Sequence, residues 1–314
     1  MIWALGGNDW IRGGAGADII DGDAGFDWSD YGDSDERVYV DLLTHEALYG
    51  TAQGDILIRI EGLMGSIFDD GLVGDHERND LRGNAGDDYL MGNGGDDALW
   101  GEAHNDTLEG GAGGDFLFGG AGIDRASYLF STTGVTASLL RPGINRGDAA
   151  GDSYLSVENL RGSNFGDFLE GDFYDNEIEG LFGRDTILGG EGNDVLFGNW
   201  AGDWLFGEDG SDVLYGGDDD DILHGGMNGV VGPDRLIGGS GADRLHVERG
   251  RRDGRVRHHR GFQPCGGGPN RRFHHRRKFD VRPPALRVRR RHWRRRPGSR
   301  SDQLESRDFE SRVQ

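Results

Sequence analysis

The chain has 314 residues, of which 59 are Gly, 7 are Pro and one, Cys265, is Cys. Hydrophobic residues make up only 35%, which is low for a single large conventional core. No apolar run reaches the roughly 20 residues that a membrane helix needs, and residues 1–9 contain no apolar stretch typical of a signal peptide. A single Cys excludes an intramolecular disulfide framework and a four-Cys zinc site.

The net charge of −22 combines two regions of opposite sign. Residues 1–243 contain 49 Asp and Glu, 11 Lys and Arg, and 52 of the glycines. Residues 244–314 contain 7 acidic and 23 basic residues. The change in composition at residue 244 therefore needs an explanation separate from that of the rest of the chain.

Glycine and aspartate recur every nine residues, and this internal repeat is the strongest signal in the sequence. Each copy can be written G-G-x-G-x-D-x-U-x, where U is a large apolar residue such as Leu90, Leu99 or Leu108. Glycine at this density makes a helix implausible, because each one costs roughly 1 kcal/mol relative to Ala. The x-U-x stretch instead predicts a short strand with one inward side chain. Two repeats would form one coil of an all-β solenoid, with coils about 4.8 Å apart.

The same period places the aspartates in rows along the predicted solenoid. Asp88, Asp106 and Asp124 fall in one row, and Asp97 and Asp115 fall in the opposite row. Unit charges about 4.8 Å apart repel by roughly 3.5 kcal/mol at an effective dielectric constant of 20, so such rows need cations in order to fold. Calcium fits best, because it accepts about six to eight oxygen ligands in irregular geometry. Zinc prefers Cys and His, and the histidines before residue 243 follow no regular spacing.

The predicted calcium ligands are the aspartate carboxylates and the carbonyl groups of the first- and fourth-position glycines. They are Asp9, Gly13, Gly16, Asp18, Asp27, Gly83, Gly86, Asp88, Gly92, Gly95, Asp97, Asp106, Gly110, Gly113, Asp115, Asp124, Gly180, Gly183, Asp185, Gly189, Gly192, Asp194, Asp203, Gly207, Gly210, Asp212, Asp221, Asp234 and Asp243. Asn79 and Asn176 replace the aspartate at the start of two runs. His104, Ala201 and Asp219 replace the fourth-position glycine, and we expect sites that use those turns to be weak or empty.

These nonapeptides resemble the RTX, or haemolysin-type, calcium-binding repeat, which forms a parallel β-roll. The clearest copies are residues 13–18 (GGAGAD) and 189–194 (GGEGND). About fifteen copies in register make the resemblance specific. The resemblance implies multiple calcium ions bound between successive turns, export by a type I secretion machinery, and folding in the extracellular space.

Residues 26–75 and 123–172 form a second kind of repeat. Identical residues recur at an offset of 97, at Tyr31/Tyr128, Val38/Val135, Asp55/Asp152, Glu61/Glu158, Leu63/Leu160, Gly65/Gly162 and Asp75/Asp172. The alternation of apolar and polar residues at 38–42 and 56–60 predicts half-buried strands. We therefore predict β-roll repeats at 1–25, 76–122 and 173–246, interleaved with two strand-rich modules that extend or cap the roll. Alternatively, the modules present a ligand surface bearing Asp55, Glu61, Asp152 and Glu158.

Residues 1–243 carry no recognisable catalytic signature. His45 and His76 each precede Glu but lack the second His of an H-E-x-x-H zinc site, and there is no G-x-S-x-G elbow and no P-loop. Aspartate is so abundant that carboxylate pairs must lie close together by chance. We therefore predict a non-enzymatic, calcium-binding secreted protein with a structural, adhesive or scaffold role. The alternative is the calcium-binding part of a secreted hydrolase or epimerase whose catalytic part lies outside this chain.

Residues 247–314 form an Arg-rich tail with no recognisable fold motif and a composition typical of disorder. The cluster at 289–296 (RRRHWRRR) is of the kind that neutralises phosphates, so a nucleic acid or an acidic surface is an alternative, less favoured partner. The interpretation we favour is a reading-frame change near residues 244–245. Codons for residues 257–273, read one base later, can encode a strand-rich segment similar to the one that follows the last repeat in RTX proteins. The sequence identifies no protein or glycan target.

Overall fold

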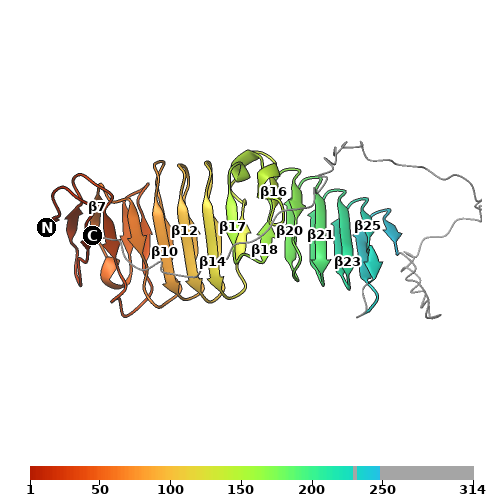
Figure 1. Cartoon of the computed structure of the whole chain (residues 1–314), viewed down its shortest axis with the longest axis horizontal. Coiled ribbons are helices and arrows are strands. Elements are labelled where there is room, and N and C mark those ends of the chain that lie inside the picture. Colours follow the sequence, from red (N-terminus) through yellow and green to blue (C-terminus); the bar gives the residue numbers. More distant parts are fainter. Residues whose placement is uncertain (229–231, 248–314) are drawn as a thin grey trace, which may run out of the picture. The chain divides into compact units, whose positions relative to one another are not determined.

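The computed structural model describes residues 1–228 and 232–247. Within these residues it contains twenty-eight short strands, three short 3-10 segments and no α-helix. The strands stack side by side in successive coils (Figure 1), which confirms the predicted all-β parallel solenoid. The Arg-rich tail from residue 248 onward, with its predicted disorder, lies outside the described residues.

Four sheets line the solenoid, and their described strand pairs are parallel except for the β5–β6 hairpin. The first sheet contains β1 (Ile2–Trp3), β3 (Ile19–Asp21) and β7 (Ile56–Ile58). The second contains β2 (Trp10–Ile11), β4 (Trp28–Asp30), β8 (Gly62–Met64), β10 (Asp80–Ala85), β12 (Ala98–Ala103), β14 (Phe116–Ala121) and β17 (Ser153–Leu155).

The third sheet is the longest of the four. It contains β5 (Tyr39–Asp41), β6 (Glu46–Leu48), β9 (Gly71–Val73), β11 (Tyr89–Met91), β13 (Thr107–Glu109), β15 (Arg125–Ser127), β18 (Asn159–Arg161), β20 (Glu177–Phe182), β22 (Val195–Trp200), β24 (Val213–Asp218) and β27 (Arg235–Ser240). The fourth contains β16 (Thr136–Ser138), β19 (Phe168–Glu170), β21 (Thr186–Gly192), β23 (Trp204–Gly210), β25 (Ile222–His224), β26 (Met227–Asn228) and β28 (Arg244–His246). The 3-10 segments are η1 (Gly50–Ala52), η2 (Pro142–Ile144) and η3 (Gly147–Ala149).

The apolar residue of each repeat forms the core. Leu81, Leu99 and Leu117 are register partners on β10, β12 and β14, and Leu90 pairs with Leu108 on β11 and β13. These side chains are fully buried, whereas the neighbouring strand residues remain partly exposed. Partners lie 18 residues apart, so two nine-residue repeats make one coil, as the period predicts. Burial of one Leu side chain is worth roughly 1.5–3 kcal/mol, which makes this row the main apolar contribution to stability.

Each module adds a third strand to one coil. At that coil one of the two sheets of the solenoid ends and a new sheet begins. The chain alternates between the first and second sheets before residue 26, between the second and third from β8 to β14, and between the third and fourth from β18 onward. At each module the register steps are 37, 34 and 32 residues instead of 18. The strands of the modules therefore continue the solenoid, while the exact residues at which each module begins and ends stay predictions.

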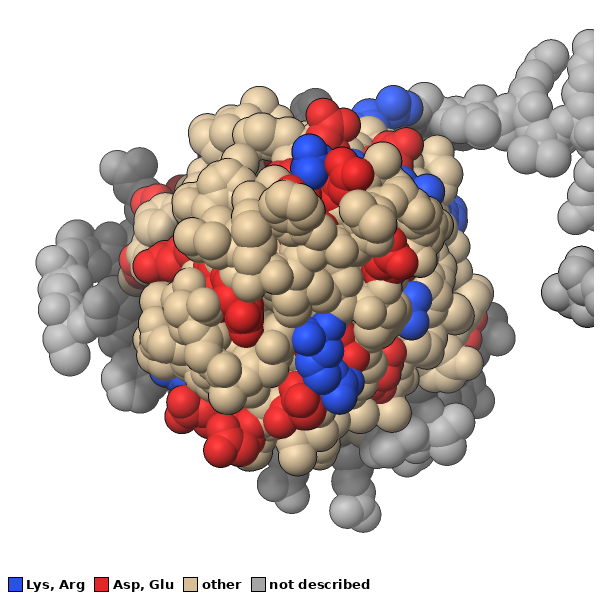
Figure 2. Space-filling view, turned by 90° about the vertical axis from the view of Figure 1, so that its left-hand side faces the viewer, with Lys and Arg blue, Asp and Glu red and all other residues tan. Residues whose placement is uncertain are grey.

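The N-terminal end of the solenoid differs from its sides. Met1, Trp3 and Leu5 are each more than 60% exposed there. Figure 2 looks onto this end and shows a largely uncharged surface interspersed with acidic and some basic side chains. Because β1 and β2 are the edge strands of their sheets, this end also presents backbone groups without a strand partner.

Candidate metal centre: two rows of buried carboxyl groups

Backbone hydrogen bonds hold the aspartates between Asp88 and Asp124 in two rows. We call each row of such bonds a ladder. In one row the backbone N–H of Asp88 donates to Oδ1 of Asp106 (2.9 Å), and that of Asp106 donates to Oδ1 of Asp124 (2.8 Å). In the other row the N–H of Asp97 donates to Oδ1 of Asp115 (2.9 Å). Each donor and its acceptor lie 18 residues apart, which is one coil. The structure thus brings together the aspartates that the period assigns to each row.

Equivalent ladders run through the last set of repeats, residues 173–246, and, with fewer links, through the repeats at the N-terminus. The N–H of Asp185 donates to Asp203 and that of Asp203 donates to Asp221, at 2.9 and 2.8 Å. This ladder continues from Asp221 to Asp243. The opposite ladder joins Asp194 to Asp212 and Asp212 to Asp234, and a ladder near the N-terminus joins Asp9 to Asp27. Asp18 is linked through its own N–H to Asp55 of the first module, so every predicted aspartate belongs to a ladder.

The second carboxyl oxygen of these aspartates is left without a partner. Sixteen buried side-chain N or O atoms in the described residues have no hydrogen-bond partner, and twelve of them are aspartate Oδ2 atoms. The twelve belong to Asp9, Asp27, Asp88, Asp97, Asp106, Asp115, Asp124, Asp185, Asp194, Asp203, Asp212 and Asp221. We call the turns that hold them open turns. A buried carboxyl oxygen without a partner is costly, so these positions require either a proton or a cation.

The first-position glycine is needed because the carboxyl group occupies the space that a side chain would fill. A β-carbon added to Gly83 would lie 2.1 Å from Asp88 Oδ2 and 2.9 Å from the carbonyl oxygen of Gly101 on the next coil. Gly92 is placed in the same way against Asp97 and the carbonyl of Gly110. In ten of the twelve open turns, all but those of Asp9 and Asp115, Oδ2 thus shares the space at the first position with a carbonyl oxygen of the next coil, and both atoms are hydrogen-bond acceptors.

Fourth-position carbonyls face the next coil as well. A β-carbon added to Gly113 would lie 1.7 Å from the carbonyl oxygen of Gly95, and one added to Gly210 would lie 1.6 Å from that of Gly192 and 2.7 Å from Asp212 Oδ1. The fourth-position glycines Gly95 and Gly192 thus place their carbonyl oxygens against the turn of the next coil.

Burial raises the pKa of these aspartates far above the ordinary value. The pKa rises to about 8 for Asp88 and Asp185, where burial is the largest cause and neighbouring carboxyl groups of the same row add repulsion. It rises to about 7 for Asp97, Asp106, Asp194 and Asp203, and to about 6 for Asp115, Asp124, Asp212 and Asp221. Near neutral pH, a folded solenoid without cations therefore has to keep many of these groups protonated.

The open turns offer carboxyl and backbone carbonyl oxygens, and His104, which stands in the turn of Asp106, already accepts the N–H of Gly86 through Nδ1. The described residues contain no group of three or more His, Cys, Asp or Glu side chains that could hold a metal ion. A cation in an open turn must therefore combine a carboxylate with backbone carbonyls, which both face it in this geometry. A set of oxygen ligands in irregular geometry, many of them backbone carbonyls, suits calcium better than zinc, which prefers Cys and His, or magnesium, which requires a regular octahedron.

Three turns in which the fourth-position glycine is replaced keep the geometry of the others. His104, Ala201 and Asp219 keep a positive φ, at 83°, 78° and 75°, although it is smaller than that of fourth-position glycines such as Gly95 (110°) and Gly113 (151°). The aspartates of these turns, Asp106, Asp203 and Asp221, retain a partnerless Oδ2. The expectation that such sites are weak or empty stays a prediction, because the substitutions alter the backbone little.

The repeat pattern did not predict several members of the ladders. Asp70 and Asp167 lie 18 residues before Asp88 and Asp185 in the same rows, so an extended register count could have found them. Glu61 and Glu158 accept the N–H groups of Asp27 and Asp124, and Asp55 and Asp152 accept those of Asp18 and Asp115. The acidic residues of the modules therefore end the ladders, and Asp55 and Asp152 are buried.

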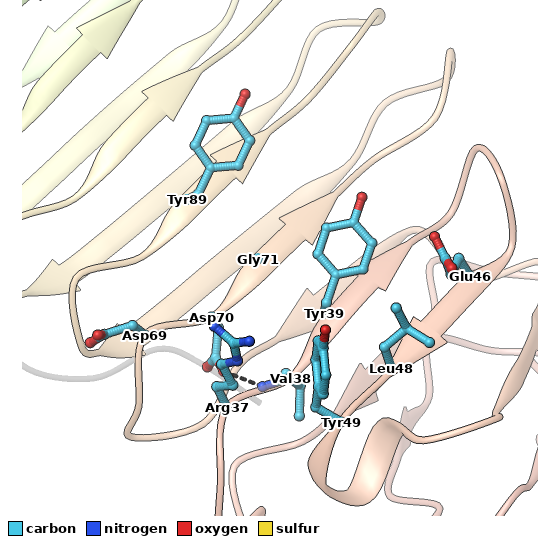
Figure 3. A pocket seen from close by; sticks show the side chains of 10 residues that line it. All are labelled: Arg37, Val38, Tyr39, Glu46, Leu48, Tyr49, Asp69, Asp70, Gly71 and Tyr89. Atoms are coloured by element: carbon cyan, nitrogen blue, oxygen red, sulfur yellow. Dashed lines mark hydrogen bonds between the residues drawn. The ribbon is translucent and has the colours of Figure 1, made fainter.

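A surface pocket of about 480 Å³ lies on the first module, lined in part by β5, β6 and β11 (Figure 3). The side chains of Tyr39 and Tyr89 project from positions on either side of Gly71, with which both are in register. At the same register in the second module, Phe168 replaces Gly71. None of the described polar side chains that line the pocket is buried without a partner, so the pocket, unlike the carboxyl rows, has no polar group that requires a ligand.

Comparison with known proteins identifies the repeats. The RTX calcium-binding nonapeptide repeat matches residues 1–28, 73–108, 92–126, 161–196, 197–228 and 227–251, which together cover more than half of the chain. A search of curated proteins found no match. Among the helical segments of the described residues, none is long and apolar enough to cross a membrane. With its parallel solenoid and its glycine-and-aspartate turns, this chain belongs to the family of proteins built from the RTX calcium-binding nonapeptide repeat.

Proposed function

We propose that the carboxyl groups of the open turns, with the first- and fourth-position carbonyls of adjacent coils, are the ligands of this chain's calcium ions. The observation that carries this assignment is the set of twelve buried aspartate Oδ2 atoms without a partner, ten of which share the space at the first-position glycine with a carbonyl oxygen of the next coil. Calcium supplies a positively charged partner for these carboxylate oxygens, which have none within the protein. The backbone N–H of the preceding coil holds Oδ1 and so fixes the orientation of each carboxyl group.

We further propose that calcium binding and folding are one event. In the unfolded chain the carboxylates are solvated and far apart, whereas in the solenoid they are buried in rows one coil apart. Burial and repulsion within a row oppose folding at neutral pH, as the raised pKa values indicate. A ligand that binds only the folded state shifts the equilibrium toward it.

The biological role that best fits this behaviour is structural, in a protein that is exported and folds outside the cell. The family match covers only repeats, which supports a scaffold or adhesive role over catalysis. Export by a type I secretion machinery is an inference from the family. It is tested by expressing the full chain with and without such a machinery and following the protein in the medium. Retention in the cytoplasm under both conditions would contradict it.

The experiment that tests calcium-driven folding is a titration of the full chain with calcium, followed by far-ultraviolet circular dichroism. We expect β-sheet signal to rise at millimolar calcium, and we expect much less change with magnesium at equal ionic strength. A spectrum that is fully β in excess chelator at pH 8, and that calcium leaves unchanged, would contradict the proposal.

A further inference from the structure

Four turns of the solenoid differ from the open turns in the direction of one backbone N–H. They span residues 65–70, 74–79, 162–167 and 171–176. In each, the N–H of the second residue donates into the turn, to the side-chain oxygen of the sixth. Asp75 donates to Asn79 Oδ1 and Asp172 donates to Asn176 Oδ1, both at 2.8 Å. Ser66 and Ser163 donate to Oδ2 of Asp70 and Asp167 in the same way. We call these closed turns.

Open turns have the opposite backbone conformation at the second residue. Asn84, Asn93 and Asn199 have φ of 83°, 73° and 75°, and the aspartates of their turns have a partnerless Oδ2. Ser66 and Asp75, by contrast, are not among the residues with positive φ. The conformation of the second residue therefore decides what the centre of the turn contains. It is either a carboxyl oxygen with a free lone pair or an oxygen that accepts the inward N–H of the second residue.

The sequence of a closed turn enforces this conformation locally. The hydroxyl oxygen of Ser66 accepts the N–H of Phe68 (3.1 Å), and Oδ1 of Asp75 accepts the N–H of Glu77 (2.8 Å). Ser163 and Asp172 make the equivalent bonds to the N–H groups of residues 165 and 174. Ser and Asp favour such turns, in which the side chain bonds to the backbone two residues later. The fourth residue then needs no positive φ, which explains why Phe, Glu and Tyr stand there instead of glycine.

Protein donors satisfy the remaining polar atoms of the closed turns. The second oxygen of Asp70 accepts the N–H of Val38 at 2.6 Å, and that of Asp167 accepts the N–H of Val135 at 2.7 Å. The side-chain amide of Asn79 donates to the carbonyl oxygen of Glu61 on the preceding coil (3.3 Å).

The second module repeats this amide bond. The side-chain amide of Asn176 donates to the carbonyl oxygen of Glu158 at 2.6 Å. In both modules, the amide group thus donates to the backbone oxygen of the residue at the same position of the preceding coil.

We propose that the four closed turns exclude calcium, so that residues 65–79 and 162–176 form calcium-free stretches within the calcium-loaded solenoid. We further propose that the second and sixth residues of a turn determine this choice. A cation there would face inward N–H groups, whose positive ends repel it. The two modules agree in every one of these bonds at an offset of 97, so the arrangement is a repeated feature. The inference rests on the proposed function, because it assumes that the open turns hold calcium.

Counting bound calcium ions in the full chain by equilibrium dialysis tests the inference. Asn79→Asp restores the carboxyl group but keeps the inward N–H of Asp75, so we expect no additional ion. Asp97→Asn changes the next aspartate of the same row, in an open turn, and is the matched control; we expect it to lose at least one ion. The triple variant Asp75→Gly, Glu77→Gly, Asn79→Asp restores the repeat consensus, and we expect it to gain one ion.

The outcomes separate this inference from the proposed function. A gain of one ion in Asn79→Asp alone would overturn the inference, because the backbone would then not exclude calcium. A folded triple variant that gains none would overturn it as well. If the triple variant does not fold, the comparison of Asn79→Asp with Asp97→Asn still decides. Failure of the unaltered chain to bind any calcium would instead overturn the proposed function.

Discussion

Acidification should fold the protein in the absence of calcium. An aspartate whose pKa is raised in the folded state contributes stability that is complete below its ordinary pKa and is lost as the pH rises through the raised value. In the open turns these raised values run from about 6 at Asp115 to about 8 at Asp88. The calcium-free solenoid should therefore lose stability between about pH 4 and pH 8, and lowering the pH from about 8 to about 5.5 in chelator should increase its β-sheet content.

The magnitude of this effect is large compared with the stability of a domain. One pKa unit corresponds to about 1.4 kcal/mol, so the raised pKa of an aspartate such as Asp106 opposes folding at higher pH by at most about 4 kcal/mol, and screening by solvent reduces this figure. Ten open-turn aspartates have a pKa of about 6 or more. Even about 1 kcal/mol for each of them is comparable with the 5–15 kcal/mol that stabilises a typical domain.

The assay is circular dichroism across this pH range in chelator, with light scattering to exclude precipitation near the isoelectric point of about 4.7. In millimolar calcium the β-sheet signal should depend far less on pH over this range, because the cation replaces the proton. Asp106→Asn carries no charge, so it should shift the folding transition in chelator toward higher pH. A signal in chelator that stays flat or falls on acidification would refute the reasoning.

Three substitutions test the packing around the rows. Gly83→Ala places a β-carbon 2.1 Å from Asp88 Oδ2 and should reduce calcium binding and stability, while Gly143→Ala, with nothing within 4 Å, should change neither. Leu99→Ala empties a fully buried core position and should lower the unfolding free energy in calcium by about 2–5 kcal/mol, measured with urea. Tyr128→Phe removes the hydroxyl that donates to Asp152 and should cost about 1–3 kcal/mol without changing the number of bound ions.

The repeating part of the fold could be predicted from the sequence because its interactions have a constant spacing. Leu81 and Leu99 pair because they are 18 residues apart, and Asp88 and Asp106 lie in one row for the same reason. A single repeat unit thus contains the strand, the turn and the carboxyl position. The offset of 97 between the modules likewise predicted that both have one structure.

The exchange of sheets at the modules could not be predicted in this way. Phe116 pairs with Ser153 across 37 residues, and no repeat of that length exists in the sequence. The pairing follows from the length of the intervening loop and from the burial of Tyr128 and Val135. Residues far apart in the chain decide it together.

The difference between open and closed turns also escaped the repeat pattern. The pattern treats Asn79 as a substituted aspartate, whereas its amide makes a specific bond to Glu61. Asp75, which replaces a glycine, sets the backbone conformation of this turn, and Ser66 does the same in the turn that ends in Asp70. Such information lies in the exceptions to the repeat, and its meaning depends on which N–H points into the turn.

The most direct test of the account is a crystal structure of the full chain grown with calcium, with an anomalous difference map to locate the ions. Peaks are predicted beside Asp106 Oδ2 and its counterparts in the other open turns. An ordered solenoid in millimolar calcium without peaks at these oxygen atoms would contradict the central claim.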